Sequence, residues 1–127
     1  MTEKQEPTKP SDEDKVVTEN LYVVQTKPLV ARDQILEALP EHLEYQVMLE
    51  QRGIMFAAGP LFDKDAETHS RGLIVIRAQS FEEAEKIAAA DPMHAHGLRS
   101  YTIDRWRINE GAITLQVRFA DRSVSLD

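Results

Sequence analysis

The folded part of the chain opens with a short run of apolar and β-branched residues at 21–28, LYVVQTKP, which predicts a strand ending at proline. Residues 31–52 change to a helical spacing, with an apolar side chain at every third or fourth position. These side chains are Ile35, Leu36, Leu39, Leu43, Val47 and Met48. Pro40 interrupts the run and predicts a kink or a fresh helix start, while Gly53 is expected to cap its end.

Two further short apolar runs, at 54–62 and 72–79, predict the second and third strands. The polar stretch DKDAETHS between them predicts a loop. Gly59 and Pro60 are expected to end the second strand in a turn.

A second helix is predicted at 81–91, because Ser80 and Glu83 have the spacing of a capping box before an apolar pattern. Pro92 is expected to weaken its end, and residues 100–108 predict a fourth strand. The order β-α-β-β-α-β is that of a ferredoxin-like α+β domain with an antiparallel sheet. The handedness of its crossovers places both helices on one face of that sheet.

Apolar and polar residues alternate at 113–119, which predicts a half-buried strand, and SVSL after Asp121 predicts a short partner. Residues 1–19 are polar, rich in acids and without apolar periodicity. We therefore divide the chain into a flexible acidic tail at 1–19, a ferredoxin-like domain at 20–110 and a C-terminal β-hairpin arm at 111–127.

The strands predicted at 21–28 and 72–79 are apolar on both faces, although two helices can cover only one. A second copy of the chain is the simplest cover for the other face, so we expect a homodimer. The C-terminal hairpin either braces that dimer or exchanges between subunits. The alternative is that the hairpin folds back over the open face of its own sheet.

The 127 residues carry a formal net charge of −7 and include no cysteine. This charge argues against binding to nucleic acid or to an anionic membrane, and the absent cysteines exclude disulfides and thiolate chemistry. There is no long apolar run, and the polar start MTEKQEPTKPSDEDK lacks the pattern of a secretory signal. We expect a cytoplasmic protein.

His42 and Asp91 are the candidate catalytic pair. Each lies about eleven residues into one of two parallel helices, so both sit at a similar height, roughly 16 Å along. A carboxylate beside an imidazole fixes its tautomer and suits it to general acid–base catalysis. The plainer interpretation is a surface histidine and an aspartate that ends a helix.

Other candidates carry weaker signals. His94 and His96 have no spacing that completes a ligand set, so we expect a loop pair and no metal site, and His69 is expected in solvated loop. Gly59 and Pro60 could admit a ligand close to the backbone, and Trp106 could line a pocket; turn formation and core packing are the alternatives. No phosphate loop or dinucleotide fingerprint is present.

The ordered set LYVVQ, PEHLEYQVMLEQRGIMFAAGPL and SFEEAEKIAAADP resembles the YciI-like (YCII-related) family over about residues 20 to 108. Its most specific elements are His42 before Leu43, the segment from Gly53 to Pro60, and Ala90-Asp91-Pro92. The family belongs to the dimeric α/β-barrel superfamily, which implies two ferredoxin-like subunits with facing sheets. Its similarity to a dehydrochlorinase of chlorinated hydroxyhydroquinones implies a His–Asp dyad at His42 and Asp91.

The sequence and the resemblance together predict a cofactor-independent lyase or isomerase acting on a small cyclic or aromatic metabolite. His42 would move a proton and Asp91 would orient it, with Gly59, Pro60 and Trp106 as substrate-binding residues. The alternatives are a non-catalytic ligand-binding or stress-associated dimeric module and a cofactor-free oxygenase.

Overall fold

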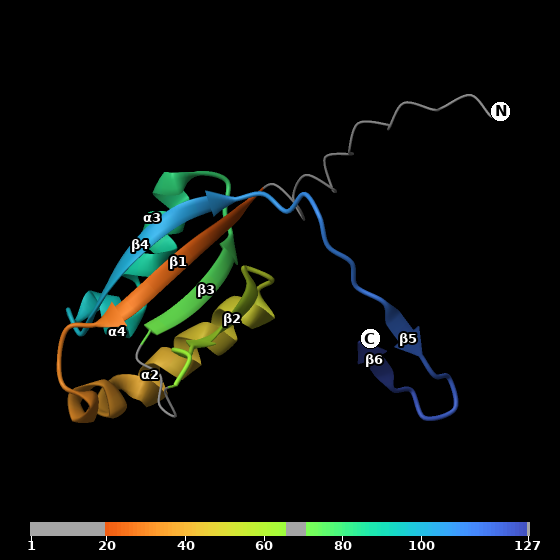
Figure 1. Cartoon of the computed structure of the whole chain (residues 1–127), viewed down its shortest axis with the longest axis horizontal. Coiled ribbons are helices and arrows are strands. Elements are labelled where there is room, and N and C mark those ends of the chain that lie inside the picture. Colours follow the sequence, from red (N-terminus) through yellow and green to blue (C-terminus); the bar gives the residue numbers. More distant parts are fainter. Residues whose placement is uncertain (1–19, 66–70, 127) are drawn as a thin grey trace.

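The computed structural model of the chain describes residues 20–65 and 71–126. The order of its elements confirms the predicted ferredoxin-like α+β arrangement, with a short hairpin after it (Figure 1). The elements are β1 (Leu21–Pro28), α2 (Arg32–Gln51), β2 (Met55–Leu61), β3 (Arg71–Arg77), α3 (Phe81–Ala89), α4 (Pro92–Ala95), β4 (Arg99–Trp106), β5 (Leu115–Val117) and β6 (Val124–Leu126). His69, predicted in a solvated loop, lies outside the described residues, as does the predicted tail at 1–19.

Strands β1 to β4 form one antiparallel sheet in the order β2-β3-β1-β4. The C-terminal end of β1 therefore lies beside the N-terminal ends of β3 and β4. Residues directly opposite each other in this register share a face of the sheet, such as Val24 with Ile74 and Ile103. This register decides which side chains meet at each end of the domain.

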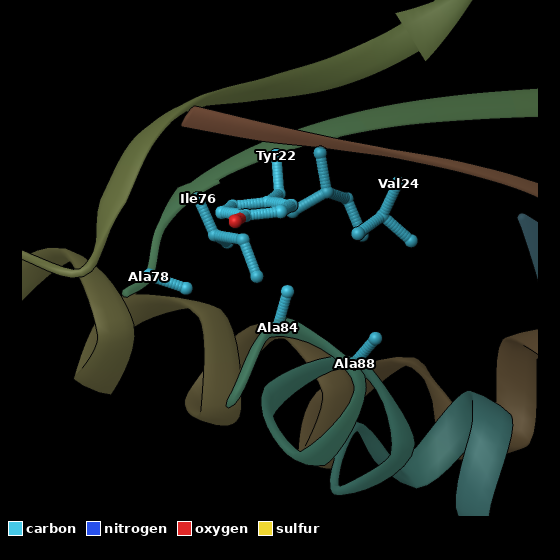
Figure 2. Close-up of a cluster of buried hydrophobic side chains, with 7 residues drawn as sticks. Tyr22, Val24, Ile76, Ala78, Ala84 and Ala88 are labelled. Atoms are coloured by element: carbon cyan, nitrogen blue, oxygen red, sulfur yellow. The ribbon is translucent and has the colours of Figure 1, made fainter. Parts of the chain in front are cut away.

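The core lies between the sheet and helix α3. Figure 2 shows the side chains of β1 and β3 above, and small side chains of α3 below. The buried cluster consists of Tyr22, Val24, Ile74, Ile76, Ala78, Ala84 and Ala88. The alanines let the α3 backbone approach the sheet closely, and Tyr22 packs edge-on against Phe81 with ring centroids 5.0 Å apart.

Helix α2 is a single helix with Pro40 inside it, so the predicted fresh start at this proline is wrong. Proline has no N–H to donate to the carbonyl of Leu36, yet the turns on either side keep their helical path. Gly53 ends the helix as predicted, with φ at 73°. The N–H of Gly53 donates to Glu50 O and that of Ile54 to Leu49 O, the two bonds of a Schellman motif.

Gly59 and Pro60 lie inside β2 and pair with Leu73 and Gly72, so the predicted turn at these residues is wrong. β2 is one of the two edge strands of the sheet, where a proline can point its missing donor toward solvent. This difference from the prediction matters for the site, because both residues are part of an extended strand at the edge of the sheet and not part of a turn.

Two helix starts in the second half are fixed by side chains. Ser80 Oγ accepts from Glu83 N–H at 3.1 Å, as predicted, and Glu83 reaches back to Gln79 N–H at 3.1 Å. Pro92 begins a new short helix, α4, whose N-cap is Asp91. His94 consequently lies in α4 rather than in a loop, which corrects the predicted loop pair, while His96 follows as its C-cap.

The predicted C-terminal hairpin is present as β5 and β6, and Figure 1 shows it standing away from the four-stranded sheet. Its apolar side chains are exposed, Phe119 to 92%, so the half-burial expected from their alternation is not found in a single chain. Alternation predicts a strand with an apolar face but does not say what covers that face. No helix among the described residues is long and apolar enough to cross a membrane.

Candidate active site

A cavity of about 520 Å³ opens between helix α2 and the end of the sheet where β1 finishes and β3 and β4 begin. Helix α2 contributes an apolar wall of Ile35, Leu36, Leu39 and Leu43. Leu36 and Leu43 are each 49% exposed, because the α2 face that would otherwise pack on the sheet lines this opening. Cavities of this size accommodate small organic ligands.

The structure brings His42 and Asp91 into contact at the wall of this cavity. The Nδ1 atom of His42 lies 2.9 Å from Asp91 Oδ1 and 2.8 Å from Oδ2. The histidine side chain is 16% exposed and lines the cavity, and the carboxylate behind it is 4% exposed. The two residues meet, but the prediction of parallel helices is wrong. α2 runs back along β1 and α3 along β3, and because these strands are antiparallel, the helices are antiparallel too.

Asp91 holds its position through the start of α4. Its Oδ1 accepts from Met93 N–H at 2.9 Å, and Met93 itself is buried. The backbone N–H and the imidazole together fix the orientation of the carboxylate. With Nδ1 donating to Asp91, the Nε2 atom of neutral His42 carries the lone pair, and no described residue hydrogen-bonds to it.

A second chain of hydrogen bonds runs beside this pair from β4 to α4. Arg99 Nε donates to Thr26 Oγ1 at 2.9 Å, and the hydroxyl lies 3.1 Å from His94 Nε2. His94 Nδ1 lies 2.7 Å from Ala88 O, which can only accept. Nδ1 is therefore the protonated nitrogen, Nε2 accepts from Thr26, and neutral His94 satisfies the whole chain.

The electrostatics agree with this assignment. The pKa of His94 is lowered, mainly by burial, with the charge of Arg99 and the neighbouring His42 ring adding to the effect, while the Ala88 carbonyl and Asp91 oppose it. Burial also raises the pKa of Tyr45, whose hydroxyl donates to Ile87 O at 2.6 Å and which feels the charge of Asp91. The centre around Asp91 thus holds one carboxylate among neutral and cationic partners.

Of the other residues predicted to bind substrate, two line the cavity and one does not. Gly59 and Pro60 line the cavity from β2. Trp106 does not line it, because it lies at the opposite end of β4, with its ring 6.5 Å from that of Phe56 and 40% of its surface exposed. A role for Trp106 in this cavity is therefore not supported within one chain.

Five polar or special residues around the cavity were not predicted from the sequence: Thr26, Gly72, Arg32, Arg71 and Arg99. One signal could have found the three arginines: Arg32 follows β1 closely, and Arg71 and Arg99 begin β3 and β4. In this antiparallel topology these three places fall at one end of the sheet. No three His, Asp or Glu side chains in the described part of the chain are placed to hold a metal ion.

The fold and the site define a class: a ferredoxin-like α+β domain with a cavity at one end of its sheet and a histidine–aspartate pair in the wall. The family model of the YCII-related domain matches residues 18–107. The chain belongs to this family, as its resemblance implied. No curated protein matches the chain in sequence.

Among solved structures, the chain is similar to 5-chloro-2-hydroxyhydroquinone dehydrochlorinase from Burkholderia phenoliruptrix AC1100 in complex with 2,5-dihydroxybenzoquinone. The two are 20% identical, with a TM-score of 0.60 over 70% of this chain and 95% of that one. At this identity the likeness concerns the fold.

Proposed function

We propose that this protein is a cofactor-independent enzyme of the lyase or isomerase type that acts on a small cyclic or aromatic metabolite. The single observation that carries the proposal is the His42–Asp91 contact in the wall of the cavity. A histidine held this way has one nitrogen fixed by the carboxylate and the other available to a bound molecule.

The chemistry that suits the pair is the transfer of a proton within one substrate. On a hydroxylated, halogenated ring, His42 Nε2 takes the proton of a ring hydroxyl and returns it to the carbon that bears the halogen. Loss of a second hydroxyl proton to water then lets the halide leave with the electron pair of its bond to carbon. The net loss is hydrogen halide, and Asp91 stabilises the imidazolium that forms between the two transfers.

The fold relative supports this choice of reaction class. It is by name a dehydrochlorinase of a chlorinated hydroxyhydroquinone, and its complex holds a dihydroxybenzoquinone. Both molecules are single rings, and a cavity of about 520 Å³ has room for one ring and its substituents.

We also propose that the working form is a homodimer built on the face of the sheet opposite the helices. By the strand register, Val23, Leu73 and Trp106 share this face. Val23 and Leu73 are partly exposed and Trp106 is 40% exposed, so a second copy would remove apolar surface from water. The exposed arm at 111–127 would brace such a dimer or exchange between its subunits.

The test is release of halide from a panel of halogenated hydroxyhydroquinones by the wild-type protein and by His42→Gln. We expect the wild type to exceed the spontaneous rate and His42→Gln to fall to it. A wild type that releases no halide but still binds these rings would favour the alternative, a non-catalytic ligand-binding module. A His42→Gln variant as active as wild type would overturn the proposed role of His42.

A further inference from the structure

The cavity has a charge opposite to that of the protein as a whole. The chain has a formal net charge of −7, yet the cavity is lined by Arg32, Arg71 and Arg99 together with His42. None of the described residues lining it is an aspartate or glutamate. Three arginines, one each from α2, β3 and β4, thus line one small volume.

Arg99 is the most firmly placed of the three. Its Nε donates to Thr26 Oγ1 at 2.9 Å and its Nη2 donates to Thr26 O at 3.1 Å, so one residue of β1 holds one edge of the guanidinium. Thr26 is buried; its hydroxyl lies within hydrogen-bond distance of His94, and Gly72 lies opposite it on β3. A guanidinium whose position is fixed before binding loses little side-chain entropy when an anionic oxygen approaches it.

The carboxylates near the cavity leave its positive character in place. Asp91 lies behind the His42 ring and bonds to it and to Met93 N–H. Asp63 pairs with Arg71 at 2.9 Å, but both side chains are exposed, to 73% and 46%, and such pairs are worth about 0–1 kcal/mol. In the described part of the chain no carboxylate lies within ion-pair distance of Arg32.

The opposite wall is apolar. The α2 side chains Ile35, Leu36, Leu39 and Leu43 face the same volume as the arginines, and His42 stands on that helix between them. A ligand that satisfies both walls has a hydrocarbon ring or chain with an anionic oxygen at one end.

We propose that the cavity binds a small organic anion, with its carboxylate or enolate oxygens on Arg99, Arg32 and Arg71 and its apolar body on α2. This deepens the proposed function, since it rests on the same cavity and names the substrate class as anionic. It can nevertheless be tested by binding alone, so its failure and the failure of the catalytic proposal are distinguishable.

The experiment is calorimetric titration of the full chain with two matched pairs of probes. Benzoate against benzamide tests the carboxylate, and 2,5-dihydroxybenzoquinone against its dimethyl ether tests the enolate. At least one anion should bind about tenfold or more tightly than its uncharged partner, and added salt should weaken only the anion. Equal affinities within both pairs, or no saturable binding of either anion, would overturn the proposal.

Substitutions test whether the arginines cause the tighter binding of the anion. Arg99→Gln should reduce anion affinity about tenfold or more and leave the uncharged probe unchanged. Arg32 and Arg71 are exposed, so their replacement by glutamine should not disturb the fold. Arg32→Gln and Arg71→Gln should each reduce the affinity for the anion by a smaller factor. These two variants still test the proposal if Arg99→Gln does not fold. Arg107→Gln removes the same charge beyond the other end of β4 and should leave both affinities as in wild type. Equal losses in Arg107→Gln and the cavity variants would contradict the assignment.

Discussion

Gly72 lies directly opposite Thr26 in the ladder between β1 and β3, and a Cβ atom at Gly72 would come 3.0 Å from Thr26 Cγ2. Such a contact is tighter than nine in ten real Cβ contacts, so the threonine would have to give by a few tenths of an ångström. Thr26 Oγ1 accepts from Arg99 and lies within hydrogen-bond distance of His94. A shift of Thr26 would therefore also move Arg99, which lines the cavity.

Gly72→Ala should therefore destabilise the fold by about 1–3 kcal/mol through overpacking, and weaken the binding of an organic anion. Gly59→Ala is the matched control for stability, because it lies on the neighbouring strand with nothing within 4 Å of its added Cβ. Thermal denaturation of both variants checks this, with Gly59→Ala expected at or above the wild-type melting temperature. Equal melting temperatures for the two variants would show that Thr26 yields without cost.

His94 should make the stability of the fold depend on pH. Its pKa is lowered in the native state, mainly by burial, whereas an unfolded histidine takes up its proton near pH 6.5. As the pH falls below about 6.5, the unfolded chain binds more protons than the native one, so the free energy of unfolding falls until the native histidine is protonated too. Urea denaturation across this range should show the slope in wild type, and His94→Gln should reduce it; an unchanged slope would contradict neutral His94.

Asp91→Asn should lower kcat on any substrate found by about 10²- to 10⁴-fold, because an amide neither fixes the tautomer of His42 nor stabilises its imidazolium. KM should change little, since Asp91 lies behind the ring. Asparagine also caps helices well, so α4 and the melting temperature should be largely kept. Asp121→Asn, on the exposed arm, is the charge-matched control and should keep full activity.

A charge on the open face of the sheet should separate the proposed dimer. Val23→Lys places its amine beside Asp104, its register partner on β4, so the single chain should tolerate it. Sedimentation should give twice the 14.4 kDa chain mass for the wild type and one chain mass for Val23→Lys. Gln51→Lys, at the exposed end of α2, should remain at the wild-type mass. A wild type that sediments as a single chain would rule the dimer out.

The sequence predicted the fold well because its signals are local. Apolar periodicity, the Ser80 cap and the Gly53 end located the helices. The contact between His42 and Asp91 could not be derived in this way, because α2 and α3 are antiparallel and the packing of the two helices decides which residues meet.

The rest of the site depends on the register between strands, which single-strand patterns do not state. Thr26 meets Arg99 and Gly72 only once β1, β3 and β4 are aligned. Pro60 belongs to a strand rather than a turn because β2 is an edge, a property of the whole sheet. The hairpin at β5 and β6 is present as predicted, but the alternation of its residues does not specify what covers its apolar side chains.

The central claim is that Asp91 holds His42 so that Nε2 carries a lone pair into the cavity. The direct measurement is the ¹⁵N NMR spectrum of the neutral His42 ring at the alkaline end of a pH titration, assigned with His42→Gln. We expect a protonated Nδ1 and an unprotonated Nε2. A proton found on Nε2 would contradict it, because Nδ1 could then not donate to Asp91 and Nε2 could not accept a proton from a substrate.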